Sequence, residues 1–169
     1  LGRIVSVQPY QSGAQTMIEG SHLAEVCRVL NNHHIRYAVA GGYACALHGH
    51  VRMTEDYDIL LHDDDENLRN TIEAIYELFP TIHEDISITD IRDNIVLKVA
   101  DEIEVDFSIR AWTLDFKGAE QDLVHAEING VDIPYLGIDA LIQSKETMRE
   151  IDQWDVKVLR EIKRNQGRI

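Results

Sequence analysis

The stretch of sequence that decides the fold is residues 39–61, VAGGYACALHGHVRMTEDYDILL. A short apolar run over residues 35–40 ends at two glycines, which interrupt an extended backbone. We expect a buried strand over residues 35–40, then a helix over residues 43–48 that begins at the glycines and ends at Gly49. A second strand is expected over residues 54–62. The stretch therefore predicts a strand, a glycine turn, a helix and a second strand in close succession.

The second strand is expected to have one chemical face and one buried face. Asp56 and Asp58 are two residues apart, and side chains two apart on a strand point the same way. Tyr57 and Ile59 then face the core. Two adjacent carboxylates repel each other unless a cation neutralises them, and such oxygen ligands suit Mg²⁺. We interpret the two carboxylates as a candidate metal site.

A third carboxylate on a neighbouring strand would complete a site for two metal ions. We expect a hairpin with arms over residues 95–100 and 103–109, and Asp106 lies on the polar face of its second arm. Sites with two metal ions stabilise the attacking and leaving oxygens of a phosphoryl displacement. Gly41 and Gly42 have no Cβ, so a ligand can come close to their backbone. The N-terminus of the helix that follows suits phosphate.

In this order, the elements resemble the nucleotidyltransferase superfamily of the DNA polymerase β type. The pattern Gly-x5-His-Gly-x2-Arg-x-Thr-x-Asp-x-Asp over residues 42–58 is similar to that of small bacterial nucleotidyltransferases. These include the AbiEii-type toxin group and the lincosamide and aminoglycoside nucleotidyltransferases. The resemblance covers residues 30–110 well and residues 138–159 more weakly. It implies an α/β (α+β) fold of the polymerase-β-like kind, with a mixed sheet flanked by helices and a helical C-terminal part.

The resemblance also implies roles for seven residues. Asp56, Asp58 and Asp106 would bind Mg²⁺ or Mn²⁺, and Asp106 would also act as, or position, the base. Gly41 and Gly42 would hold the triphosphate of a bound nucleoside triphosphate, Arg52 would contact phosphate, and Lys145 would contact phosphate or the base and sugar. Arg149, Asp152 and Asp155 stand at suitable places on the C-terminal helices. Two features depart from the family. Many members have Gly-Ser in place of Gly41-Gly42, and the chain has Glu150-Ile151 where a basic residue and a proline are expected.

The activity implied by the resemblance is transfer of a nucleoside monophosphate from a nucleoside triphosphate to an acceptor hydroxyl, with release of pyrophosphate. The acceptor stays open between a small molecule, a protein side chain and an RNA end. The alternative is a catalytically degenerate protein that binds nucleotide or a partner protein, as in a toxin–antitoxin-like pair. Two further alternatives are a metal-binding domain without transfer chemistry, and a tight turn beside two solvent-facing aspartates. All three expected carboxylates are present, which favours an enzyme.

Composition limits the class of protein. With 44% hydrophobic residues in 169, the chain has enough apolar side chains for a core and is not a disordered chain. We divide it into an N-terminal arm (1–20), a catalytic core (21–135) and C-terminal helices (136–169) that complete the same domain. The net charge of −14 disfavours non-specific nucleic-acid binding, which depends on basic contacts. We expect a cytoplasmic protein without a signal peptide, a membrane span or a disulfide framework.

The remaining elements follow from local patterns. Ser21 is expected to cap a helix with the buried stripe Leu23, Val26, Cys27 and Leu30, and the acidic run over residues 63–66 is expected to open another helix. A short strand is predicted over 86–89, a helical patch over 116–124, an extended stretch over 125–135, a helix from Asp139 to about 147, and a helix over 151–163 with Ile151, Trp154, Val158 and Ile162 facing inward. We interpret His48 and His50 as packing at a helix end, and Trp112 and Trp154 as core or interface anchors.

Overall fold

The structure is a computed structural model that describes residues 3–5, 12–99 and 103–168. Its strands are β1 (Arg3–Val5), β2 (Tyr37–Val39), β3 (Asp56–Leu61), β4 (Ile95–Val99), β5 (Ile103–Ser108), β6 (Arg110–Ala111), β7 (Leu114–Asp115), β8 (Val124–Ile128) and β9 (Val131–Tyr135). Its helices are α1 (Ser12–Glu19), α2 (Leu23–Asn32), α3 (Gly41–Leu47), α4 (Asp65–Leu78), α5 (Ile88–Arg92), α6 (Phe116–Ala119), the 3₁₀ helix η2 (Glu120–Asp122), α7 (Ile138–Ser144) and α8 (Glu150–Gln166).

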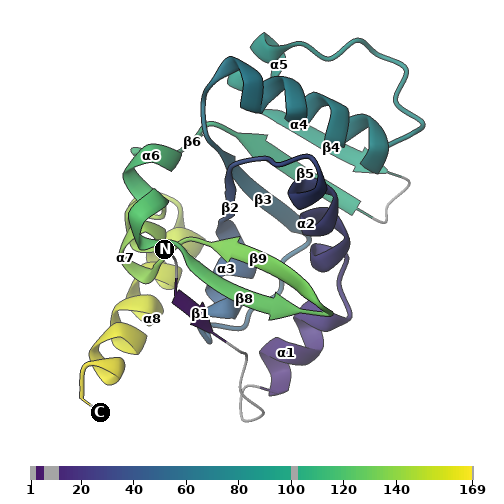
Figure 1. The fold of residues 1–169 in the computed structure, drawn as a ribbon. Helices are drawn as coiled ribbons and strands as arrows, with labels where there is room; N and C mark the ends of the chain where they lie inside the picture. Colours follow the sequence, from purple (N-terminus) through teal and green to yellow (C-terminus); the bar gives the residue numbers. More distant parts are fainter. Residues whose placement is uncertain (1–2, 6–11, 100–102, 169) are drawn as a thin grey trace.

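Seven strands form one mixed sheet in the order β1-β8-β9-β2-β3-β5-β4, and β6 and β7 form a separate small hairpin. β3 pairs with β5 in parallel and with β2 in antiparallel fashion, and the predicted hairpin is the antiparallel pair β4 and β5. Figure 1 shows α6, α7 and α8 gathered on one side of the molecule, away from α4 and α5. The predicted fold class, a mixed sheet flanked by helices with a helical C-terminal part, is confirmed.

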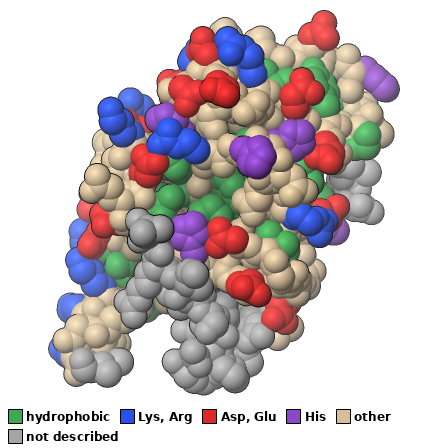
Figure 2. Space-filling model, viewed as in Figure 1, with side chains coloured by type: hydrophobic (Ala, Val, Ile, Leu, Met, Phe, Trp, Pro, Cys, Tyr) green, Lys and Arg blue, Asp and Glu red, His purple; other side chains and the backbone are tan. Residues whose placement is uncertain are grey.

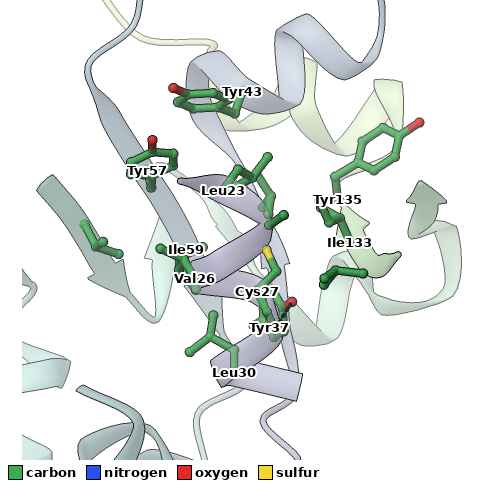
Figure 3. Close-up of a cluster of buried hydrophobic side chains, with 14 of the residues drawn as sticks. Leu23, Val26, Cys27, Leu30, Tyr37, Tyr43, Tyr57, Ile59, Ile133 and Tyr135 are labelled. Atoms are coloured by element: carbon green, nitrogen blue, oxygen red, sulfur yellow. Dashed lines mark hydrogen bonds between the residues drawn. The ribbon is translucent and has the colours of Figure 1, made fainter. Parts of the chain in front are cut away.

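The larger core lies between the sheet and the helices α1, α2 and α4. Val39 and Ile59 contribute to it from the sheet, and α2 contributes the predicted stripe with Cys27 at its centre. Figure 3 shows this cluster, with the ring of Tyr43 above that of Tyr57. The two rings are stacked, with their centres 4.7 Å apart. Aromatic pairs at this spacing add to the stabilisation that burial alone provides.

A second core lies on the opposite side of β2 and β3. Ala38 and Leu60 alternate with residues of the first core and pack with Leu141 of α7 and Leu159 of α8. Side chains on a strand point alternately to its two faces, so the same two strands serve both cores. The C-terminal helices are therefore packed on the central strands.

Side-chain hydrogen bonds fix where two of the helices begin. The Ser21 hydroxyl accepts a hydrogen bond from the backbone N–H of Leu23, although the residue at the N-cap of α2 is His22. At the start of α4 the carboxylate of Asp64 accepts a hydrogen bond from the N–H of Asn67, which satisfies a donor that the helix leaves unpaired. The acidic run thus has the local role that the sequence predicts.

The structure differs from the prediction in three places. Residues 86–89 are not a strand: α5 begins at Ile88, and Ser87 and Asp90 form a reciprocal capping box at its start. In the stretch 1–20, for which the sequence predicts only an arm, β1 pairs with β8 and α1 buries Ala14 and Ile18 in the first core. α7 is preceded by Gly137 and not capped by Asp139.

The final helix exists, but a different face of it is buried. α8 buries the residues Asp152, Asp155, Val156 and Leu159. Ile151 and Trp154 are exposed, and Val158 and Ile162 are half-buried. Trp112 is exposed as well, so neither tryptophan is a core anchor.

Among the helices of the described residues, none has the length and apolar character needed to cross a membrane. On the face shown in Figure 2, the coloured acidic and basic side chains are interspersed and do not form one basic patch.

Candidate active site

One pocket of about 770 Å³ opens where β3, β5, the start of α3 and the loop between α7 and α8 meet. The residues that the sequence singled out all line it: Gly41, Gly42, Arg52, Asp56, Asp58, Asp106 and Lys145. These residues are separated by up to about a hundred positions in the chain, and the fold brings them together. Their roles remain predictions.

The pairing of β3 with β5 places the carboxylates on one face of the sheet. Asp58 lies directly opposite Asp106, and Asp56 lies opposite Glu104. The intervening Tyr57 is buried in the first core. On this face Leu60 is covered by the second core, whereas the aspartates face the pocket. The site is therefore the part of the sheet that the C-terminal helices leave open.

Asp58 and Asp106 are held in an unfavourable electrostatic environment. Burial, together with repulsion from the nearby Asp106 and Asp56, raises the pKa of Asp58 to about 6. Burial also raises the pKa of Asp106. A hydrogen bond from Asn94 lowers this pKa, but the effect of burial is larger. The Oδ1 atom of Asp106 is buried and has no hydrogen-bond partner in the described part of the chain. Such an oxygen is costly to bury unless something else satisfies it.

Neighbouring side chains leave no room for a side chain at Gly41 or Gly42. Gly41 has a φ of +61°, and a Cβ added there would lie 1.9 Å from Oδ2 of Asp58. A Cβ on Gly42 would lie 2.6 Å from both Cβ and Oγ1 of Thr54. The backbone of Gly41 is therefore packed against the carboxylate. Thr54 fills the space of a side chain at position 42, which is a physical reason for glycine where many members of the resembling family have serine.

Behind the pocket, Asp155 of α8 is fully buried and holds three cationic or potentially cationic side chains. Its carboxylate accepts two hydrogen bonds of 2.8 Å from Arg52, lies 2.8 Å from Nε2 of His50, and lies 2.7 Å from Nζ of Lys145. Burial alone would raise the pKa of Asp155, but the hydrogen bonds from His50, Arg52 and Lys145 outweigh it and hold this pKa well below its usual range. His50 is thus a hydrogen-bond partner of Asp155, and not only packing at a helix end.

Asp152, one turn before Asp155, completes the cluster. It lies 3.5 Å from Nζ of Lys145 and accepts a hydrogen bond of 2.6 Å from the hydroxyl of Thr147. Residues 152, 155, 156 and 159 follow the i, i+3, i+4, i+7 spacing of one helical face. That spacing is the signal available in the sequence, but two of the four residues are aspartates, which a search for an apolar stripe does not count.

The site has the donor chemistry of a magnesium or manganese site, although it is not a closed ligand shell. In the described residues, no three His, Cys, Asp or Glu side chains are grouped so as to hold a metal ion. The carboxylates still fit such an ion by chemistry, because Mg²⁺ prefers carboxylates, water and phosphate oxygens. A cation would also relieve the repulsion between Asp58 and its neighbours and give the buried oxygen of Asp106 a partner.

Comparison with known proteins identifies the fold. No family model matches the chain, and no curated protein matches it. Among solved structures, an antigenic nucleotidyltransferase-like protein from Paracoccidioides brasiliensis matches with a TM-score of 0.55 and 17% identity. The match covers 86% of this chain and 74% of that one. The chain has a nucleotidyltransferase-like fold. At this identity the likeness concerns the fold alone, and the relation to the AbiEii-type and antibiotic-modifying groups stays a prediction.

Proposed function

We propose that this protein is a metal-dependent nucleotidyltransferase that moves a nucleoside monophosphate from a nucleoside triphosphate to an acceptor hydroxyl. The observation that carries the proposal is the pairing of Asp58 with Asp106 across β3 and β5. This pair lies in the pocket with Asp56, and Oδ1 of Asp106 has no hydrogen-bond partner among the residues that the structure describes. The nucleotidyltransferase-like fold supports the proposal.

The charges around the pocket suit a polyphosphate. Lys145 and Arg52 line the wall beside the carboxylates, and Asp155 holds both from behind. A triphosphate carries several negative charges, so we expect it to lie between these cations and a metal held by the aspartates. The pocket volume of about 770 Å³ lies within the range of roughly 300–1,000 Å³ that small-ligand sites occupy.

The chemistry follows from these positions. Asp56, Asp58 and Asp106 would hold Mg²⁺ or Mn²⁺, which would neutralise negative charge on the phosphates. Asp106 accepts the proton of the acceptor hydroxyl or orients that hydroxyl. The acceptor oxygen then forms a bond to the α-phosphorus while the bond to the β-phosphate oxygen breaks, and pyrophosphate leaves with the electron pair. Lys145 and Arg52 stabilise the charge on the leaving group, so catalysis is mainly positioning and electrostatics.

The test is calorimetric titration of each of the four nucleoside triphosphates with and without Mg²⁺. We expect magnesium-dependent binding that the double variant Asp56→Asn/Asp58→Asn loses. The matched control is Asp85→Asn, which changes an exposed aspartate that does not line the pocket. Release of pyrophosphate in the presence of candidate acceptors (small hydroxylated molecules, proteins and RNA ends) then tests the transfer step.

Failure of the folded wild-type protein to bind any nucleoside triphosphate would contradict the proposal. The degenerate or partner-binding alternative would then be favoured, and affinity capture with an excess of purified candidate partners would follow. Binding that persists unchanged in the double variant would instead contradict the assignment of Asp56 and Asp58.

A further inference from the structure

The rim of the pocket carries two large apolar side chains that the fold does not bury. Trp112 is 55% exposed and Met148 is 86% exposed, and both line the pocket whose other walls are mainly polar or charged. Exposed apolar surface is common on proteins when it is scattered. Here two of the seven large hydrophobic residues that are exposed in the described part of the chain belong to one pocket, on segments that are distant in the sequence.

Trp112 has a backbone conformation that is unusual for a large side chain. Trp112 and Thr113 form the turn between β6 and β7, and Trp112 has a φ of +58°. A two-residue hairpin turn requires a positive φ here and favours glycine or asparagine, so a residue as bulky as tryptophan is an outlier at this position. The indole is thus placed at the pocket against the local preference of the turn.

The hairpin is also tied to the other wall of the pocket. The side-chain amide of Gln143, in the last turn of α7, donates a hydrogen bond of 3.3 Å to the hydroxyl of Thr113. The chain then continues through Lys145, which lies at the pocket wall, to Met148 three residues later. This arrangement sets the indole and the thioether on two segments that meet beside the proposed phosphate-binding cations.

We infer that Trp112 and Met148 form the subsite for the nucleobase of the bound nucleotide; the inference rests on the proposed function. A nucleobase is a planar ring with an exposed π face, and stacking on an aromatic side chain suits every base. The thioether of methionine is polarisable and adapts to flat rings. A nucleotide whose phosphates lie beside Lys145 extends its sugar and base along the segment that ends at Met148.

The charge next to Trp112 is consistent with a nucleotide. Arg110 precedes the turn on β6, is exposed, and lines the same pocket. Its side chain forms no ion pair with any residue that the structure describes.

Stacking on Trp112 is expected to grow with the area of the nucleobase. The subsite should therefore favour purine over pyrimidine nucleotides.

The experiment uses the fact that the chain has two tryptophans. The variant Trp154→Phe leaves Trp112 as the fluorescent reporter, and we expect ATP with Mg²⁺ to quench its emission. In calorimetry, Trp112→Ala should weaken ATP binding by roughly 5- to 150-fold, the range that base–aromatic stacking supports. Inorganic tripolyphosphate, which has no base, should bind Trp112→Ala and the wild-type protein equally well.

Two variants serve as controls. Trp112→Phe keeps an aromatic face and should restore most of the affinity for ATP. Trp154→Ala removes an equally exposed tryptophan that does not line the pocket, and it should leave the affinity unchanged. Met148→Ala should weaken ATP binding without affecting tripolyphosphate.

The outcomes separate this inference from the proposed function. If the wild-type protein binds ATP but Trp112→Ala binds it equally well and the emission of Trp112 does not change, the base lies elsewhere and the inference is overturned. If Trp112→Ala weakens ATP and tripolyphosphate alike, Trp112 acts on the phosphates or on the pocket as a whole, and the inference again fails. If neither ATP nor tripolyphosphate binds the folded wild-type protein, the proposed function itself is contradicted.

Discussion

Asp58 is a half-buried carboxylate next to two other carboxylates, and the folded chain holds it at an energetic cost. Its pKa is raised to about 6, above the value near 4 of an aspartate in an unfolded chain. The folded state therefore binds more protons than the unfolded state between about pH 4 and 6, so this group makes stability fall as the pH rises through that window. The difference corresponds to roughly 2–3 kcal/mol at neutral pH.

The prediction is that Asp58→Asn stabilises the fold while it removes magnesium-dependent nucleotide binding. In metal-free buffer at pH 7.5, the free energy of unfolding by urea should increase by about 1–3 kcal/mol, and the gain should shrink toward pH 4. Asp85→Asn serves as the exposed control. A variant less stable than the wild type at pH 7.5 would show that the carboxylate contributes favourable contacts that outweigh its repulsion.

Gly41 and Asp58 are predicted to be coupled. Gly41→Ala should cost about 1–3 kcal/mol of stability, because the residue must keep a φ of +61° and its Cβ would overlap the carboxylate of Asp58. In the background of Asp58→Ala the overlapping oxygen is absent, so the same substitution should cost less. A double-mutant cycle with urea unfolding measures the difference. Equal costs in the two backgrounds would mean that the backbone conformation alone makes glycine necessary.

At the scale of elements, the buried ion-pair cluster attaches α8 to the pocket wall. Asp155 is fully buried and bonds Arg52, His50 and Lys145. Removing one partner of such a cluster leaves uncompensated buried charge, so Asp155→Ala should destabilise the fold by about 3–5 kcal/mol. Asp139→Ala is the control, because it removes an exposed ion pair with Lys163 that is worth about 1 kcal/mol or less.

The cluster also gives a dependence on pH that can be checked. The pKa of Asp155 is held well below its usual range, so its stabilising contribution is present above about pH 4, the unfolded value, and is lost as the pH falls below it. The free energy of unfolding of the wild type should therefore fall more steeply below pH 4 than that of Asp155→Asn. Parallel curves for the two proteins would contradict the assigned direction of the pKa.

The same helix shows where sequence reasoning ends. The order of strands and helices over residues 35–79 was predictable, because apolar periodicity, the glycines and the acidic run are local signals. The buried face of α8 was not predictable from such signals. The prediction that Ile151 and Trp154 face inward assumes that apolar residues are buried and acidic residues are exposed. Asp155 is buried against Arg52, His50 and Lys145, which come from other segments. Asp152 is buried beside Lys145 and the hydroxyl of Thr147. The start of α5, where a strand over residues 86–89 is predicted, could be found from the sequence, since Ser87 and Asp90 have the spacing of a capping box.

The candidate site was predictable to a similar extent. The alternation within β3 indicated that Asp56 and Asp58 share a face, and the polar face of the later hairpin indicated Asp106. Nothing local could indicate that Asp106 lies opposite Asp58, since that depends on which strands pair and in which register. The position of Trp112 beside the pocket is not predictable for the same reason, because the adjacent Thr113 is bonded by Gln143, about thirty residues later.

For the whole molecule, the two cores share strands, so the C-terminal helices are expected to unfold together with the sheet. Leu60 of β3 packs with Leu141 and Leu159 in the second core, while Ile59 beside it belongs to the first. In the variant Trp112→Phe, the remaining tryptophan, Trp154, reports on α8. We predict that urea unfolding followed by its fluorescence coincides with unfolding followed by far-UV circular dichroism, as two-state behaviour requires.

The substitution Leu60→Ala, in the sheet, tests whether the sheet and α8 unfold together. Because Leu60 is fully buried between the sheet and the C-terminal helices, the change should cost about 2–5 kcal/mol and should lower both midpoints by the same amount. If the midpoint from Trp154 fell while that from circular dichroism stayed in place, α8 would be a separately unfolding element. The pocket wall formed by Lys145 and Arg52 would then detach without loss of the sheet, and nucleotide affinity would depend on the docking of α8. Coincident shifts would instead mean that the carboxylates and the cations of the pocket are held by one cooperative unit.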